Sequence, residues 1–418
     1  MYLKRSHYCG QLRASHVGLE VTLCGWVDRW RDHGGIVFID LRDREGIAQV
    51  VFDPSNINMD LPSQLRQEFV IAIRGKVRRR PATMENKNLK TGEIEVAVTE
   101  LELLNRSQTL PFSLHDDSPS QGETDESLRL AYRYLDLRRP PLQNNLGIRH
   151  RFLKSVRDFY NDNGFWEIET PILYKSTPEG ARDYLVPSRV YPGSFYALPQ
   201  SPQTLKQLCM IAGFDRYFQI ARCFRDEDLR ADRQPEFTQI DVEMSFVDEN
   251  DVLDVQEKMM KKLFKDVMGA DVSVPFRKIP YAQAMLDYGS DKPDLRNSLG
   301  LSDLTEQATK SSFQVYKNAV EQGGIIKGLC FEEKQPISRS ELDQLPAKVA
   351  RFGAKGISWF RIKGPGEWQS PQAKFFDDAL KAQVEAKLPF NKAAMLLLLC
   401  GPEKVVNQAL DALRQDYG

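Results

Sequence analysis

The chain has 418 residues, of which 41% are hydrophobic and 28% charged, and its formal net charge is −1. This composition is ordinary for a folded globular protein of about three domains, and it excludes disordered, fibrous and strongly basic chains. Any nucleic acid must therefore bind to local basic patches, because the chain has no net positive field.

The cysteines and the N-terminus give no sign of a metal centre, a disulfide scaffold or a targeting signal. The six cysteines are scattered, without a C-x-x-C pair or a cluster with histidine, which is typical of a reducing cytosol. Met1–Arg5 runs into polar residues, and no apolar stretch is long enough to span a bilayer. We expect a cytoplasmic protein.

The first predicted module is a run of strands within residues 19–104. Alternating apolar and polar residues, separated by turn residues such as Gly34-Gly35, predict these strands. Five strands in about 85 residues suit a closed β-barrel of the OB type, and an SH3-like or sandwich module suits them equally well. The predicted strands are Leu19–Trp30, Ile36–Leu41, Ile47–Phe52, Phe69–Val77 and Glu93–Leu103.

Residues 105–140 lack regular periodicity and are predicted to be a hinge or linker, with turn residues at Ser118–Gly122 and a break at Pro140-Pro141. Apolar residues at helical spacing from Leu146 to Tyr160 then predict a helix that ends at Asn163-Gly164. The elements predicted next are strands at Phe165–Pro171 and Phe195–Leu198, a helix from Ser201-Pro202 to about Ala212, strands at Tyr217–Arg225 and Glu236–Phe246, and a helix at Val252–Met268. From about Tyr288 the pattern is mixed α/β, with a strand at Ala394–Cys400, which indicates a separate inserted module.

The two strands Tyr217–Arg225 and Glu236–Phe246 are the most informative segment. The two-residue period of a strand places polar residues on one face and apolar residues, among them Phe218, Ile220 and Phe224, on a face expected to be buried. The polar residues are Gln219, Cys223, Arg225, Gln239, Asp241 and Glu243. Such a face can hold a triphosphate and an ammonium, but a solvated outer face of a sheet has the same composition.

The residue strings are more specific than their composition. Motif 2 of the class II aminoacyl-tRNA synthetases resembles two neighbouring segments of this chain, Arg222–Asp228 and Arg233–Gln239. The residues in these segments are those typical of the aspartyl enzymes. The helix and strand that end at Pro171 resemble motif 1, the dimer-interface element of that class. Thr177–Asp183 resembles the mobile loop that closes over aspartate, and Gln200–Gln203 with Lys206 resembles the amino-acid pocket.

The same resemblance covers essentially the whole chain. Gly25-Trp26-Val27 and Phe38–Asp43 resemble the anticodon-binding OB domain, and Gly289–Arg296 and Phe352–Gly356 resemble the insertion of bacterial aspartyl enzymes. The implied fold is a multidomain α+β protein. Its implied parts are an OB domain at residues 1–106, a hinge at 107–140, the first part of the class II catalytic domain at 141–287 and an inserted α/β module at 288–418.

The implied activity is that of an aspartate–tRNA ligase, which forms aspartyl-adenylate from L-aspartate and ATP, with Mg²⁺, and transfers aspartate to the 3′ end of tRNA(Asp). A homodimer is implied through motif 1. Asparaginyl- and lysyl-tRNA synthetases are related alternatives. A non-catalytic tRNA-binding paralogue is the alternative outside the enzyme class.

The resemblance also implies individual roles. Arg225 is the implied catalytic residue, since a guanidinium can bridge the α-phosphate and the attacking carboxylate; a structural salt bridge is the alternative. Lys206 is implied to bind the side-chain carboxylate of aspartate, with an exposed helical lysine as the alternative. The other implied aspartate ligands are Glu179, Ser201, Gln203 and Asp241, although Asp241 and Glu243 can instead be structural acids. Asp226, Glu227 and Gln234 join Arg225 as implied ATP ligands, with a solvent-facing loop tip as the alternative.

In the barrel, the resemblance and the usual OB strategy imply that Arg31, Gln49 and Glu95 read anticodon bases. Phe38 would stack on a base or belong to the barrel core. His33-Gly34 stands where aspartyl enzymes restricted to tRNA(Asp) often have leucine, which favours a non-discriminating enzyme that also charges tRNA(Asn). A loop histidine without consequence is the alternative.

One departure from the family pattern concerns motif 3, a Gly-rich strand and helix with an arginine for the γ-phosphate, which does not occur in the 418 residues. No complete carboxylate set for Mg²⁺ is recognisable either, and no metal ligands are predicted. We expect a protein that ends at Gly418 to bind anticodon stem-loops without forming adenylate. Measurable ATP–pyrophosphate exchange by that chain would contradict the expectation.

Overall fold

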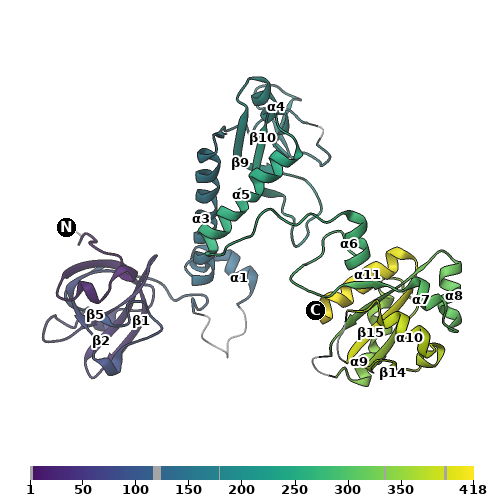
Figure 1. Ribbon diagram of the computed structural model, residues 1–418. Helices are drawn as coiled ribbons and strands as arrows, with labels where there is room; N and C mark the ends of the chain where they lie inside the picture. The colour runs from purple at the N-terminus through teal and green to yellow at the C-terminus, as the bar shows by residue number, and fades with distance from the viewer. Residues whose placement is uncertain (1–2, 116–123, 178, 334–335, 390–392) are drawn as a thin grey trace. The chain divides into compact units, whose positions relative to one another are not determined.

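The structure is a computed structural model that describes residues 3–115, 124–177, 179–333, 336–389 and 393–418 (Figure 1). Two compact units are present, one of Met1–Glu243 with Asp266–Met268 and one of Met244–Lys265 with Gly269–Gly418. The domain boundaries inferred from the sequence remain predictions. None of the helices in the described ranges has the length and apolar character needed to cross a membrane.

The N-terminal strands form a closed barrel in the order β1-β2-β3-β5-β4, which confirms the predicted barrel and rules out the sandwich. The barrel closes because β1 pairs with both β2 and β4, while β3 and β5 run parallel. Inward-facing residues such as Val21, Ile39 and Phe52 are fully buried in its core. The elements are β1 Glu20–His33, β2 Ile36–Asp43, β3 Gly46–Phe52, β4 Val70–Arg79 and β5 Ile94–Asn105, with short 3₁₀ helices at Cys9–Gln11, Ala14–His16, Pro62–Gln64 and Ala82–Met84.

The predicted linker is helical over part of its length, so that prediction is wrong there. It contains α1, Glu126–Ala131, and α2, Arg133–Asp136. The side chain of Asp125 caps α1 by accepting hydrogen bonds from the backbone of Ser127 and Leu128. Helices of six and four residues are too short to show an apolar period, which is why the pattern missed them. The turn predicted at Ser118–Gly122 lies outside the described residues.

Helix α3, Pro140–Asp162, begins at the two prolines that were predicted to break the chain. Proline is tolerated in the first turn, where its missing N–H would have no helical partner. The helix ends where predicted, at Asn163, and Gly164 follows with a φ of +78°. Of the predicted apolar stripe, Val156 and Tyr160 are buried but Leu146 is exposed.

A three-stranded sheet in the order β10-β9-β6 follows, with β6 parallel to β9. The strand predicted over Phe165–Pro171 shortens to β6, Trp166–Glu167. The other elements of this region are β7 Leu185–Pro187 paired with β8 Phe195–Ala197, α4 Gln203–Ile211, β9 Arg216–Phe224, β10 Glu236–Met244 and α5 Glu249–Met268.

The second unit contains the predicted mixed α/β module, an antiparallel sheet in the order β11-β12-β15-β13-β14. One hydrophobic cluster contains Leu397 and Leu399 and the other contains Leu396 and Leu398, so both faces of β15 are covered. Its strands are β11 Leu301–Asp303, β12 Ile325–Phe331, β13 Ser358–Gly364, β14 Glu367–Gln369 and β15 Ala394–Gly401. Its helices are α6 Tyr281–Tyr288, α7 Thr305–Thr309, α8 Gln314–Glu321, α9 Arg339–Ala350, α10 Asp378–Glu385 and α11 Glu403–Tyr417, with a 3₁₀ turn at Ala373–Phe375.

Candidate functional site

The polar face of β9 and β10 is the more buried one, which corrects the expected orientation of the sheet. Cys223 is fully buried and Asp241 is 7% exposed, whereas Ile220 and Phe224 are only half-buried. Phe218 is buried, as predicted. The polar face tolerates burial because it faces an opposite charge on α4, so it is not a solvated outer face.

That opposite charge is Lys206, which is 9% exposed and therefore not an exposed helical lysine. Its ammonium donates to Asp241 Oδ1 at 2.9 Å and lies 3.3 Å from Glu243 Oε2. Burial alone would lower the pKa of Lys206, but the hydrogen bond and charge of Asp241, with Glu243, raise that pKa above its usual value. Burial raises the pKa of Asp241, and Lys206 offsets only part of this rise. The Tyr217 hydroxyl lies near enough to lower the pKa of Asp241, but it donates to Gln219, and Asp241 Oδ2 is buried without a hydrogen bond of normal geometry from the described residues. This oxygen is therefore available to an incoming cation.

Arg225 directly follows β9, two residues after the buried Cys223. Its backbone N–H donates to Pro235 at 2.9 Å, and its guanidinium lies 5.1 Å from the centre of the Phe237 ring. The buried Nε of Arg225 has no hydrogen-bond partner within the described ranges. A donor left unpaired in this way is suited to an anionic ligand.

The thiol of Cys223 lies among the predicted site residues. Burial raises its pKa to about 11, the charges of Asp241 and Glu179 add to the rise, and those of Arg225 and Lys206 oppose it. Four predicted site residues from three segments of the chain therefore all affect the pKa of one buried thiol. Of these four, Lys206 and Asp241 are in direct contact.

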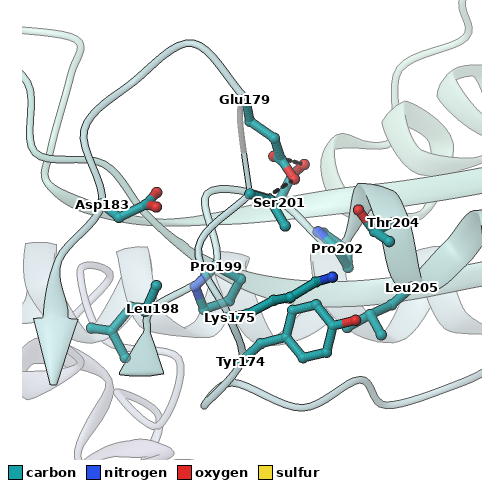
Figure 2. Close-up of a pocket in the computed structure, with 12 residues that line it drawn as sticks. Tyr174, Lys175, Glu179, Asp183, Leu198, Pro199, Ser201, Pro202, Thr204 and Leu205 are labelled. Atoms are coloured by element: carbon teal, nitrogen blue, oxygen red, sulfur yellow. Dashed lines mark hydrogen bonds between the residues drawn. The ribbon is translucent and has the colours of Figure 1, made fainter. Parts of the chain in front are cut away.

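Glu179 helps to line a small cleft together with Lys175, Asp183 and Pro202. Ser201 Oγ donates to Glu179 Oε2 at 2.5 Å, as Figure 2 shows. Gln203, the first residue of α4, is half-buried. Pro178, within the predicted mobile loop, lies outside the described residues.

The loop between β9 and β10 is more exposed than this cluster. Asp226, Glu227 and Gln234 are all exposed, and Glu227 lies 3.6 Å from Arg233. The backbone N–H of Asp226 donates to the carbonyl of Arg182 at 3.0 Å. The ATP roles of these three residues therefore remain predictions.

On the barrel, Phe38 is half-buried and lies outside the core cluster, so the core alternative is wrong. The ring of His33 meets it edge-on, with 5.7 Å between ring centres. A half-exposed aromatic ring on an OB barrel is suited to stacking on a base.

The predicted base readers form one hydrogen-bonded chain beside Phe38. Gln49 donates to Glu95 at 2.9 Å, and Arg31 donates to Gln49 at 3.5 Å. Asp40, which was not predicted, accepts from Arg31 at 2.7 Å, and Arg78 donates to Glu95 at 2.8 Å. The two-residue period of β2 could have indicated Asp40, because it places Asp40 on the same face as Phe38.

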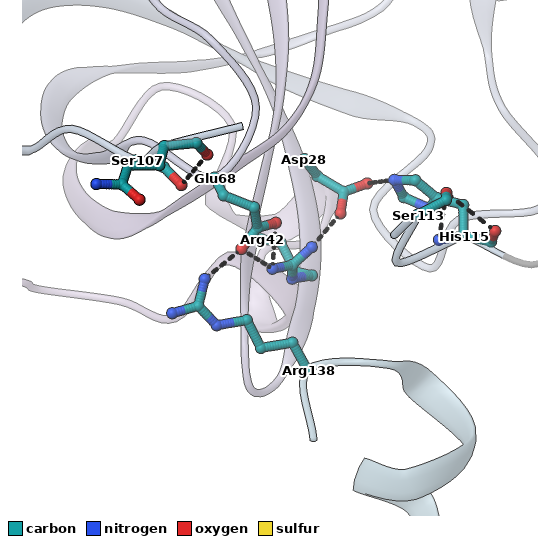
Figure 3. Close-up of polar contacts among 8 residues, drawn as sticks. Asp28, Arg42, Glu68, Ser107, Ser113, His115 and Arg138 are labelled. Carbon is teal, nitrogen blue, oxygen red and sulfur yellow. Dashed lines mark hydrogen bonds and ion pairs between the residues drawn. The ribbon is translucent and has the colours of Figure 1, made fainter. Parts of the chain in front are cut away.

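A second feature that the sequence did not indicate is a buried ion cluster where the barrel meets the segment before α3 (Figure 3). The carboxylate of Glu68 accepts from Arg42 at 2.7 and 2.9 Å and from Arg138 at 2.5 Å. Arg42 also donates to Asp28, and His115 lies 3.5 Å from Asp28. Glu68 has a φ of +63°, a backbone conformation that is strained for a residue with a side chain. Burial of its carboxylate costs further free energy, which the arginine contacts offset. We name Asp28, Arg42, Glu68 and Arg138 the hinge cluster.

The described residues include no group of three or more histidine, cysteine, aspartate or glutamate side chains that could hold a metal ion. In the buried cluster, Asp241 and Glu243 are both within reach of Lys206. These residues alone do not make a magnesium site.

Two family models match the chain, one described as tRNA synthetases class II (D, K and N) over residues 125–375 and one as an OB-fold nucleic acid binding domain over residues 21–104. The chain is similar to proteins named aspartate–tRNA(Asp/Asn) ligase. It is 53% identical to that of Desulfatibacillum aliphaticivorans, over 99% of this chain and 69% of the relative. It is 50% identical to that of Endomicrobium trichonymphae, over 100% of this chain and 70% of the relative.

Among solved structures, the chain is similar in fold to asparaginyl-tRNA synthetase from Pyrococcus horikoshii in complex with asparaginyl-adenylate. The TM-score is 0.55 at 17% identity, over 98% of this chain and 95% of that one. The likeness shows the fold alone.

Proposed function

The chain belongs to the aspartate–tRNA ligase family of class II tRNA synthetases, and from that premise we propose that it contributes the aspartate pocket, the motif 2 hairpin and the anticodon-binding barrel to an enzyme that activates L-aspartate with ATP and transfers it to tRNA(Asp), with motif 3 as the part of the active site that these 418 residues do not supply. The observation that carries this proposal is the buried pair of Lys206 and Asp241, with Arg225 directly after the strand that pairs with that of Asp241. The charges of these three residues match the three charged groups of aspartate. The similar proteins from Desulfatibacillum aliphaticivorans and Endomicrobium trichonymphae are both named aspartate–tRNA(Asp/Asn) ligase, which favours aspartate as the substrate over asparagine and lysine.

Aspartate binding proceeds by an exchange of ion-pair partners. The side-chain carboxylate of the substrate forms an ion pair with the ammonium of Lys206. The ammonium of the substrate forms an ion pair with Oδ2 of Asp241. Asparagine offers Lys206 no negative charge, so the buried ammonium would lose a charge-assisted hydrogen bond worth about 1.5–3 kcal/mol. Glu179, Ser201 and Gln203 cover the bound amino acid.

Arg225 is the proposed catalytic residue. Its guanidinium, with Nε unpaired, bridges the α-phosphate of ATP and the attacking carboxylate in two-point contact. Phosphoryl transfer depends mainly on positioning and charge neutralisation, which a fixed guanidinium provides. Asp226, Glu227 and Gln234 are proposed to contact ATP from the exposed loop. Mg²⁺ is expected to arrive bound to the phosphates of ATP, and we assign it no step and no protein ligands.

We propose that the barrel binds the anticodon, with Phe38 as the stacking platform and Arg31, Gln49 and Glu95 as readers. His33, beside Phe38, supports charging of tRNA(Asn) as well as tRNA(Asp), and the relatives carry both in their printed names. Aminoacylation of purified tRNA(Asp) and tRNA(Asn) tests this extension. Rejection of tRNA(Asn) would refute it without affecting the assignment to aspartate.

Two further parts of the proposal concern the assembly and the compartment. A homodimer through the motif 1 segment, α3 and β6, is proposed by family resemblance, and sedimentation would test it. The cytoplasm is proposed because tRNA and ATP are there, and all six cysteines are free thiols.

The decisive experiment replaces Lys206 with methionine in the full-length protein. We expect the KM for aspartate in ATP–pyrophosphate exchange to rise by about tenfold or more, and the preference for aspartate over asparagine to fall. Lys154→Met is the matched control, because Lys154 forms an exposed pair with Asp158 on α3. An unchanged KM and an unchanged preference would refute the proposed role of the cluster.

A further inference from the structure

We propose that Gln200 is a positioning residue that holds Glu179 over the aspartate pocket. This inference rests on the proposed function, and it adds a residue that touches no substrate. Gln200 lies between β8 and α4 and is 1% exposed. Its neighbours in the sequence are Pro199 and Ser201, and Pro202 follows, so the backbone of this turn is restricted on both sides.

The side-chain amide of Gln200 clamps one residue of the segment that carries Glu179. Its Oε1 accepts from the N–H of Ala181 at 3.0 Å, and its Nε2 donates to the carbonyl of Ala181 at 2.8 Å. Nε2 also donates to the carboxylate of Asp183. A primary amide has two N–H donors and an oxygen with two lone pairs, so both donors and one of the two acceptor positions are used within the protein. Gln200 therefore has no N–H left to donate to a carboxylate of aspartate.

The next residue holds Glu179 itself. Ser201 Oγ donates to Glu179 Oε2 at 2.5 Å, and Thr177 Oγ1 donates to Oε1 at 3.1 Å (Figure 2). The turn of Gln200 and Ser201 thus holds residues 179–183 through hydrogen bonds at two points, the backbone of Ala181 and the side chain of Glu179. Fixing both points defines where the carboxylate of Glu179 lies, because only Gly180 separates the two gripped residues.

Other contacts keep this segment in place without fixing Glu179. Ser176 donates to Asp183, and the backbone N–H of Asp226 donates to Arg182. Loss of the Gln200 amide should therefore leave the segment attached at its C-terminal end. The expected defect is a misplaced Glu179 and not an unfolded domain. Such a defect raises the KM for aspartate more than the KM for ATP.

The test compares Gln200→Met with Gln207→Met in the full-length protein, since Gln207 is an exposed glutamine on α4. Hydrogen exchange of the Ala181 amide should accelerate by about tenfold or more in Gln200→Met, while exchange of the Asp226 amide stays unchanged. The KM for aspartate should rise by about tenfold, and the KM for ATP should change by less than about twofold. Equal rises in both KM values, or unchanged exchange at Ala181, would overturn the proposal.

Gln200→Glu provides a second variant, in case methionine disturbs the core. A charged glutamate can accept from Ala181 but cannot donate to its carbonyl, and it repels Asp183. The aspartate KM of this variant should fall toward the wild-type value as the pH is lowered and the glutamate gains a proton. A defect independent of pH would contradict the clamp. The exchange measurement needs no substrate, so failure of the proposed function and failure of this inference are distinguishable.

Discussion

The thiol of Cys223 is a probe of the buried cluster that needs no substrate. Its pKa is raised to about 11 because burial and the carboxylate of Asp241 disfavour the thiolate. A cysteine of ordinary pKa, near 9.0, becomes reactive below the pH at which Cys223 does. At pH 8 the thiolate fraction of Cys223 should be about a hundredfold smaller than that of an unfolded cysteine.

Alkylation by iodoacetamide, followed by mass spectrometry, measures this difference. Cys223 should react far more slowly than the same residue in urea, and its rate should climb as the pH approaches 11. Since the folded pKa exceeds the unfolded one, the stability from the protonated thiol is present below pH 9 and is lost as the pH rises toward 11. Fast labelling at pH 8 would show that the thiol is not buried beside a carboxylate.

Single residues were predictable from the sequence where a motif named them. Glu179, Lys206 and Arg225 came from three quoted strings and Asp241 from the polar face of a predicted strand, and the charges of all four affect the pKa of Cys223. Their roles are still predictions. Gln200 was part of a quoted motif but had no predicted role, because a clamp on a backbone amide depends on where another segment lies.

The barrel shows which properties of an element follow from its pattern. The five runs predicted five strands, but their number suited a sandwich as well as a closed barrel, and closure is established by the pairing of β1 with both β2 and β4. The pattern could not decide whether Phe38 points inward, because residues 36–39 are all apolar and do not alternate. The short helices α1 and α2 escaped prediction because they hold too few residues to show a period, and the strand predicted over Phe165–Pro171 is only two residues long as β6.

Phe38→Ala tests the proposed stacking platform. Because Phe38 is half-buried and outside the barrel core, we expect its loss to destabilise the barrel by less than about 1 kcal/mol. Binding of an anticodon stem-loop should weaken by about 1–3 kcal/mol, the usual contribution of one stacked base. Leu104→Ala removes an exposed apolar residue of β5 as a control and should leave binding unchanged. Fluorescence anisotropy and thermal unfolding measure the two effects, and equal binding by both variants would argue against stacking.

Across the first unit, the hinge cluster connects the barrel to the segment that begins α3. Arg138 is its only member from outside the barrel, and it precedes α3 by two residues. It donates to Glu68 at 2.5 Å, and its guanidinium lies 5.3 Å from the centre of the Trp26 ring. Glu68 also accepts two hydrogen bonds from Arg42, so its buried charge stays paired when Arg138 is removed. The cluster can therefore lose its link to α3 without loss of the barrel.

Arg138→Met should lower the rate of aminoacylation of whole tRNA without weakening the binding of an anticodon stem-loop. Binding of an isolated stem-loop should be unchanged, because Arg42 still neutralises Glu68 within the barrel. ATP–pyrophosphate exchange should also be unchanged, because Arg138 lies outside the cluster around Cys223. The kcat/KM for aminoacylation of whole tRNA should fall by about tenfold, since a tRNA held by the barrel then reaches the acceptor site from many barrel orientations instead of one.

Arg74→Met is the matched control, because it removes an arginine from an exposed barrel pair, that with Glu100 at 2.8 Å, which has no link to α3. It should leave all three measurements within about twofold of wild type, as expected for a surface ion pair. Arg138→Met could weaken stem-loop binding by the same factor by which it lowers the kcat/KM for aminoacylation. Arg138 would then stabilise the barrel itself and would not hold the barrel against the segment that begins α3. If neither quantity changes, the direction of the barrel depends on contacts other than Glu68 and Arg138.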